Sequence, residues 1–324
     1  MVYGAGGVGG VIGAELHKAG FPVALIARGE HLLALRGDGM LYQTPLGSER
    51  LRVPAVGHPS DLDDRPDDVF LMTMKSQHSM AALETLRAVR GEETPVVCCQ
   101  NGVANERMAL RRFRAVYAML VYLPAQLIEP GVVQCHSKLK AGVLDLCRFP
   151  EQVDALSISL AERLNAANFS VRPDARVMRL KYAKLITNLN NALEAVATPE
   201  EDVDDIRKQM RAEARACFSA AGIDFAKAEE VRERRTGIVE GGGIPGVERV
   251  GGSSRQSLLR GTGDIEADYL NGEVVQLGRV HGIPTPANAV LQRLAVDAAA
   301  NRRPPGQASA ASIRAAIERE ATLA

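Results

Sequence analysis

Six residues near the start of the chain, Gly4-Ala5-Gly6-Gly7-Val8-Gly9, constrain its fold more than any other segment. They match a G-x-G-x-x-G turn between a strand and a helix. In that turn the first glycine permits a tight bend, the second lets the backbone approach a pyrophosphate, and the third allows close helix–strand packing. Residues 11–19 fit the amphipathic helix that should follow, and residues 23–27 fit a buried parallel strand. The pattern predicts a short first strand and a dinucleotide-binding turn whose cofactor contacts are Gly4, Gly6, Gly7, Val8 and Gly9.

Arg28 follows the second predicted strand, at the position that selects the cofactor. An acidic residue there would bind the ribose 2′-OH of NAD, whereas an arginine suits the 2′-phosphate of NADP. A guanidinium can hold a phosphate through two hydrogen bonds. Glu30 is nearby but belongs to the following loop or helix, and the alternative for Arg28 is a solvated loop residue. The sequence favours NADP over NAD.

Length and composition exclude several classes of protein. A chain of 324 residues suits two domains. Its 39 basic and 39 acidic residues balance, so nucleic-acid binding has no electrostatic support. No apolar run reaches the roughly 20 residues of a membrane helix, and no signal peptide is visible. The five cysteines show no metal-site spacing, and Cys98 and Cys99 are predicted to be buried core thiols. We expect a cytoplasmic protein with no metal site and no membrane or nucleic-acid partner.

The first half of the chain alternates apolar strand patterns with helix patterns. This order predicts a doubly wound α/β sheet with a ligand crevice at the carboxyl ends of its strands. Lys75 and Asn101 follow two of these strands, and residues 132–135 are expected to continue the same sheet. The predicted strands and helices cover residues 23–27, 41–44, 51–56, 69–74, 80–89, 95–99, 116–121, 132–135 and 151–167.

The second half has almost only helical periodicity. Gly241-Gly242-Gly243 is expected to be a flexible loop and not a second phosphate site, because no strand precedes it. We predict a Rossmann-type NADP-binding domain over residues 1–172, an all-helical substrate domain over residues 173–324, and a site in the cleft between them. The helices are predicted at residues 177–197, 203–221, 226–234, 266–279, 289–300 and 313–320.

A polar stripe marks the first of these helices. Lys184, Asn188 and Asn191 are spaced i, i+4 and i+7, so at 100° per residue they share one face. The alternative is a solvated face. As a pocket wall, the lysine could polarise a substrate carbonyl and protonate the new alkoxide, while the amides hold substrate oxygens.

Several motifs in order resemble the ketopantoate reductase (2-dehydropantoate 2-reductase) family. They are the glycine signature, Arg28, Lys75, Gln100-Asn101-Gly102, residues 184–188, Ser253-Ser254, and residues 266–272 with His281-Gly282-Ile283. The resemblance implies a Rossmann sheet followed by a helical domain, as in 6-phosphogluconate dehydrogenase. It also implies NADPH-dependent reduction of 2-dehydropantoate to pantoate in the pantothenate pathway, and a possible homodimer.

The resemblance also assigns roles to residues of the helical half. Lys184 corresponds to the catalytic general acid and Glu266 to a catalytic glutamate that orients substrate and lysine beside the cofactor. Asn188 and Ser254 then hold the substrate, and Asn191, which shares the polar stripe with Lys184, is predicted to bind it as well. Without the resemblance, Glu266 would rather be a surface residue at a helix start.

The remaining assigned roles concern the cofactor. Asn101 corresponds to a residue that bridges cofactor and substrate, Lys75 to one that supports cofactor binding, and Arg28 to the 2′-phosphate contact.

Two positions depart from the family pattern. Ala192 stands where an asparagine is frequent, and Leu258 where a polar or acidic residue is common. Either the helix is locally shifted or the pocket differs, and both changes leave hydride transfer intact. Two alternatives to ketopantoate reduction stay open. One is a reductase of a different small 2-oxo acid. The other is a non-catalytic NADP(H) sensor, which would need only the glycines and Arg28.

Overall fold

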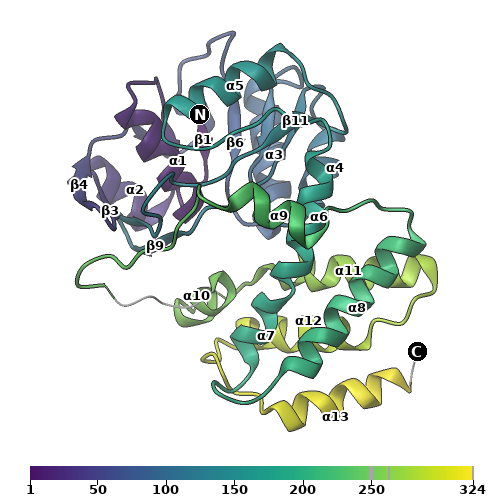
Figure 1. Ribbon diagram of the computed structural model, residues 1–324. Coiled ribbons are helices and arrows are strands. Elements are labelled where there is room, and N and C mark those ends of the chain that lie inside the picture. Colours follow the sequence, from purple (N-terminus) through teal and green to yellow (C-terminus); the bar gives the residue numbers. More distant parts are fainter. Residues whose placement is uncertain (248–251, 262, 323–324) are drawn as a thin grey trace. The chain divides into compact units, whose positions relative to one another are not determined.

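The computed structural model describes residues 1–247, 252–261 and 263–322 (Figure 1). The chain forms two compact units. Unit 1 comprises Met1–Gln100, Asn105–Leu180 and Lys227–Glu248, and unit 2 comprises Asn101–Ala104, Lys181–Ala226 and Arg249–Ala324. The chain therefore passes between the units several times, and the domain division expected at residue 172 stays a prediction.

Unit 1 contains the predicted doubly wound sheet, in the order β11-β8-β7-β6-β1-β2-β5. All neighbouring strands are parallel except β11, which pairs antiparallel with β8. The short first strand, β1, lies between β2 and β6, and Figure 1 labels β1 and its neighbour β6. The strands are β1 (Val2–Tyr3), β2 (Leu25–Ile26), β5 (Ala55–Val56), β6 (Phe70–Met72), β7 (Val96–Cys98), β8 (Val116–Met119) and β11 (Leu146–Arg148).

Both faces of this sheet are buried, which is why its strands are continuous apolar runs. Alternate residues such as Val2 and Tyr3 enter different core clusters. One cluster includes residues of α1 (Gly7–Lys18) and α5 (Ala155–Ala166), and the other includes residues of α3 (Ser79–Arg90) and α4 (Asn105–Leu110).

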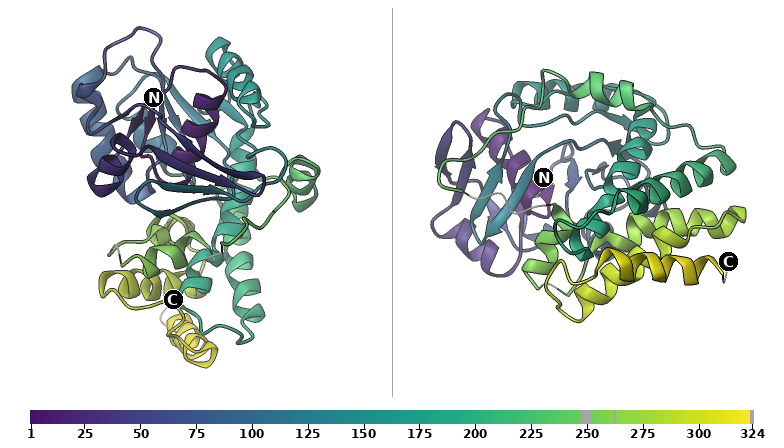
Figure 2. Two further views of the ribbon diagram at one scale, coloured as in Figure 1. Left: turned by 90° about the vertical axis from the view of Figure 1, so that its left-hand side faces the viewer. Right: turned by 60° about the horizontal axis from the view of Figure 1, so that its bottom comes forward.

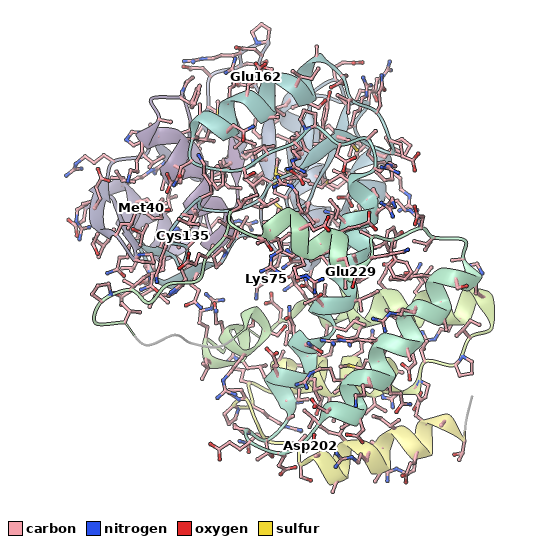
Figure 3. The ribbon with its side chains drawn as sticks, viewed as in Figure 1. Met40, Lys75, Cys135, Glu162, Asp202 and Glu229 are labelled. Carbon is pink, nitrogen blue, oxygen red and sulfur yellow. The ribbon has the colours of Figure 1, made fainter. Side chains whose placement is uncertain are left out.

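A second, four-stranded sheet in unit 1 was not predicted. Its order is β4-β3-β10-β9, with β3 (Met40–Thr44), β4 (Gly47–Leu51), β9 (Ala125–Glu129) and β10 (Val132–Cys135). The expectation that residues 132–135 continue the main sheet is therefore wrong. They pair parallel with β3 and antiparallel with β9 instead. Met40 and Cys135, labelled in Figure 3, belong to this sheet. It packs on α1, where a methyl group added at Gly10 would come within 2.7 Å of the Val133 side chain.

Unit 2 is helical where the structure describes it, and Figure 2 gives two further views of its helices. The single helix expected at residues 177–197 is wrong, because α6 ends at Asn188 and α7 begins at Asn190, with Leu189 as an interrupting turn residue between them. The helix expected from residue 266 also differs, since it opens with a 3-10 turn, η3 (Glu266–Tyr269). The helices are α6 (Val177–Asn188), α7 (Asn190–Val196), α8 (Asp204–Ala220), α10 (Ser253–Leu259), α11 (Asn271–His281), α12 (Pro286–Ala300) and α13 (Ala310–Ala321).

One segment of the second half belongs to unit 1. Residues 227–248, with α9 (Ala228–Arg235), are part of that unit. Arg234 and Asp145 form a buried, two-pronged ion pair at 2.6 and 2.5 Å, and their side chains are 5% and 1% exposed. The Gly242 amide donates to the His136 carbonyl at 3.0 Å. The glycine run, expected to be a flexible loop, is therefore hydrogen-bonded to the backbone that follows β10. A backbone hydrogen bond and a buried ion pair hold this segment in unit 1. Both join residues far apart in the chain, so the local sequence pattern could not predict them.

The structure describes the cysteines, the apolarity of the helices and the grouping of potential metal ligands. All five cysteines are buried and none forms a disulfide, and the burial was predicted for Cys98 and Cys99. No helix in the described ranges is long and apolar enough to cross a membrane. Within the same ranges, no group of three or more histidine, cysteine or acidic side chains could hold a metal ion.

Candidate active site

The glycine turn of unit 1 has the conformation that its sequence requires. Gly4 has φ +103°, and a methyl group there would come within 2.7 Å of the Met74 backbone nitrogen. Only glycine tolerates both conditions. A side chain at Gly9 would overlap the Gly4 carbonyl and the Thr73 hydroxyl, so this glycine lets helix and strand approach closely. A methyl group at Gly6 would meet nothing within 4 Å, which leaves room for a ligand beside the backbone.

The start of α1 is chemically suited to phosphate. Gly6 is its N-cap, no side chain caps the helix, and its first turn contains no acidic residue. The first N–H groups of a helix have no partner within the helix, and its dipole favours a negative charge there. These features fit the pyrophosphate of a dinucleotide.

His31 supports this turn from a second element, α2 (Gly29–Arg36). Its Nδ1 accepts from the Gly131 amide at 2.9 Å, so Nε2 carries the proton and donates to the Ala5 carbonyl at 2.7 Å. Burial lowers the pKa of His31, which favours the neutral ring that this pair of bonds needs. Sequence reasoning missed this histidine, since nothing in its local pattern indicates a contact with Ala5.

Arg28 and Lys75 occupy the strand ends expected for them. The amides of Gly4 and Ala5 donate to the Ile26 carbonyl, which joins the glycine turn to the end of β2, and the exposed Arg28 follows two residues later. Lys75, labelled in Figure 3, is half-buried beyond the end of β6. Their contacts with a cofactor stay predictions.

A buried chain of polar side chains, also missed from the sequence, fixes the loops after β6 and β7. Gln100 donates to Ser79 at 3.1 Å, Ser79 donates to Asn105 at 2.6 Å, and Asn105 donates to Ser76 at 3.0 Å. Ser76 directly follows Lys75, so this chain restrains the backbone that carries the lysine.

Unit 2 brings Lys184 and Asn101 together, although they are 83 residues apart in the chain. The Lys184 ammonium donates to Asn101 Oδ1 at 2.7 Å, and the lysine is half-buried on α6. A hydrogen bond to a charged group is stronger than a neutral one. Asn101 therefore fixes where the ammonium of Lys184 lies.

The turn that carries Asn101 packs against the segment that carries Glu266. Gly102 has φ +76°, and a methyl group there would come within 2.8 Å of the Tyr269 carbonyl oxygen. Tyr269 ends η3, and Glu266, which begins it, is buried with 7% exposure. The alternative of a surface glutamate at a helix start is therefore wrong, while the catalytic role stays a prediction.

The predicted substrate-binding residues lie on α6, α7 and α10. Asn188 is the last residue of α6 and is 8% exposed, whereas Asn191 lies beyond the interruption, on α7. Ser254 is 3% exposed on α10, which packs against α7. The two departures from the family pattern, Ala192 and Leu258, are both buried.

Comparison with known proteins places this site in a family. Residues 1–145 match the model "Ketopantoate reductase PanE/ApbA", and residues 176–298 match "Ketopantoate reductase PanE/ApbA C terminal". A 2-dehydropantoate 2-reductase from Pyrococcus horikoshii is 23% identical over 310 residues, which are 90% of this chain and 95% of that protein.

Solved structures agree in fold. A PanE/ApbA family ketopantoate reductase from Ralstonia eutropha is 27% identical with a TM-score of 0.76, and the match covers 94% of this chain and 100% of that one. A D-mandelate dehydrogenase is 20% identical with the same TM-score of 0.76, and the match covers 93% and 99%. The chain thus belongs to the ketopantoate reductase PanE/ApbA family and is an oxidoreductase that acts on a 2-oxo acid.

Proposed function

We propose that the protein reduces 2-dehydropantoate to pantoate with NADPH. The observation that carries the proposal is the 2.7 Å contact of the Lys184 ammonium with Asn101, on a turn packed against the Glu266 segment. It places a proton donor among residues that the family resemblance assigns to the reaction.

The residues of unit 2 can complete the reduction of a ketone. Bound NADPH would supply the hydride that reaches the ketone carbon. Lys184 then gives a proton to the new alkoxide oxygen, and Asn101 keeps its ammonium directed. Asn188 and Ser254 hold the oxygens of the 2-oxo acid, and the buried Glu266 orients the lysine and the substrate.

The residues of unit 1 fit the cofactor. The open space at Gly6 and the uncapped start of α1 suit the pyrophosphate, and Lys75 supports its binding. The exposed Arg28 at the end of β2 offers two hydrogen bonds to a 2′-phosphate, which favours NADPH over NADH.

A second candidate is the reduction of a different small 2-oxo acid. Ala192 and Leu258 are 1% and 4% exposed on the packed helices α7 and α10. Because both side chains are apolar, neither can form a hydrogen bond with a distal hydroxyl of the substrate. The same fold occurs in a D-mandelate dehydrogenase whose solved structure holds NADH and anilino(oxo)acetate.

Oxidation of NADPH by the purified protein, measured against a panel of 2-oxo acids that includes ketopantoate, tests both candidates. Turnover with ketopantoate supports the proposal. Turnover only with other 2-oxo acids supports the second candidate, and no turnover with any of them refutes both.

A further inference from the structure

The interruption between α6 and α7 has a partner in the buried core of unit 2. Helix kinks occur at proline, at glycine or serine pairs, at π-bulges, or where a side chain inserts into the hydrogen-bond ladder. Leu189 and its neighbours Asn188 and Asn190 include no proline, glycine or serine. The Leu189 amide still donates to the Leu185 carbonyl at 3.0 Å, and the Leu189 carbonyl accepts from the side-chain amide of Asn271, at a long 3.4 Å.

Asn271 is held by a second buried amide. Its Nδ2 also donates to Asn288 Oδ1 at 3.1 Å, and both side chains are 0% exposed. Asn288 in turn donates to the Met210 carbonyl at 3.0 Å and to Glu213 Oε2 at 2.7 Å. Buried polar groups of this kind are costly unless they are paired, so the geometry of each is set by the others.

Glu213 anchors the far end of this network. It accepts the backbone amides of Ala287 and Asn288 at 2.9 and 3.0 Å, in the first turn of α12. Those amides have no partner within their helix, and the positive end of the helix dipole favours a carboxylate there. The network of Glu213, Asn288 and Asn271 therefore links the start of α12 to the interruption at Leu189.

This network also reaches both segments assigned to catalysis. Asn271 begins α11 and follows η3, which Glu266 begins. Leu189 directly follows Asn188, the residue one helical turn beyond Lys184. One side chain thus touches the backbone directly after the lysine helix and belongs to the segment that continues from Glu266.

We propose that Asn271, held by Asn288 and Glu213, is a positioning residue: it fixes the interruption at Leu189 and thereby the placement of Lys184 and Asn188 relative to Asn191. This inference rests on the proposed function for its catalytic consequence. Its structural part, the restraint on Leu189, does not.

The test compares Asn271→Ala with a matched control, Ile313→Ala. Ile313 is 0% exposed on α13 of the same unit and has no role in the site, so its truncation destabilises unit 2 without touching the network. If Asn271→Ala does not fold, Asn271→Ser keeps a small polar group that is too short to hold the Leu189 carbonyl. Both proteins are measured below their unfolding transitions.

Two measurements are made on each variant. Amide hydrogen exchange over residues 186–193 is expected to become about 3- to 10-fold faster in the Asn271 variant and to change little in the control. The kcat for the 2-oxo acid is expected to fall about 10- to 100-fold in the Asn271 variant only. The Kd for NADPH should stay unchanged, because its expected ligands in unit 1 are untouched.

Exchange that is no faster than in the Ile313→Ala control would overturn the proposal. So would faster exchange with a wild-type kcat, or an equal loss of kcat in both variants. A wild-type protein that turns over no 2-oxo acid would instead refute the proposed function. In that case the exchange rates would still decide whether Asn271 fixes the interruption.

Discussion

The contact between Lys184 and Asn101 can be tested with a double-mutant cycle. Lys184→Ala removes the proposed proton donor, and general acid catalysis typically contributes about 10²–10⁴-fold to the rate. Asn101→Ala leaves the donor but removes the acceptor that lies 2.7 Å from its ammonium. A hydrogen bond to a charged group contributes about 1.5–3 kcal/mol, which corresponds to about 10- to 150-fold in rate.

The two effects should not multiply. If Asn101 acts by directing Lys184, the double variant should be about as slow as Lys184→Ala alone, since no ammonium is left to direct. NADPH oxidation at saturating substrate gives kcat for the four proteins, and fluorescence titration gives the Kd for NADPH. Lys208→Ala, an exposed lysine on α8 of the same unit, is the control and should keep the wild-type rate.

Two results would refute this reasoning. A near-normal kcat in Lys184→Ala would show that Lys184 is not the proton donor. Losses that multiply in the double variant would show that Asn101 acts independently of Lys184, for example through its own contacts with cofactor and substrate.

Other consequences can be measured separately. Arg28→Ala should weaken the binding free energy of NADPH by about 1.5–3 kcal/mol and that of NADH much less, while Arg36→Ala on α2 should change neither. Equal weakening of the binding of both cofactors would contradict the 2′-phosphate role. Because burial lowers the pKa of His31, the unfolded chain takes up its proton first as pH falls below about 6.5. The Tm should therefore fall more between pH 7 and pH 5 in the wild type than in His31→Gln, and parallel curves would argue against the neutral bridge to Gly131. Because Leu258 is apolar where the family commonly has a polar or acidic residue, kcat/KM for ketopantoate should exceed that for 2-oxoisovalerate by less than about a thousandfold, and a larger preference would show that another group reads the hydroxyl.

The main sheet was predictable because its determinants are local. Strands buried on both faces are continuous apolar runs, and glycines at a tight turn show directly in the sequence. Pairing in the small sheet is not local: Gln134 of β10 donates to Gln43 of β3, 91 residues away. A strand pattern predicts that a segment is extended, but it does not determine which strand will be its neighbour.

In the candidate site, too, features set by neighbouring residues were predictable and features set by distant residues were not. Lys184 and Asn188 were found as a helical stripe, and their one-turn spacing survives in α6. The contact of Lys184 with Asn101, the burial of Glu266 and the bridge made by His31 all depend on residues far apart in the chain. Residue type and family resemblance selected Lys184, Asn101 and Glu266 but missed His31, and no local pattern contained the partners of these side chains.

The position of Asn191 shows why the spacing argument holds only in part. At 100° per residue an unbroken helix places it on the face of Lys184. That rotation applies only within one regular helix, and the structure has two, α6 and α7, separated by Leu189, whose carbonyl accepts from Asn271. Ala192, one residue farther on, is 1% exposed and packs in the core, where an unpaired amide would be costly. The amides that α7 offers are therefore the half-buried Asn190 and Asn191, and we expect their direction to depend on this tertiary contact as well as on helical periodicity.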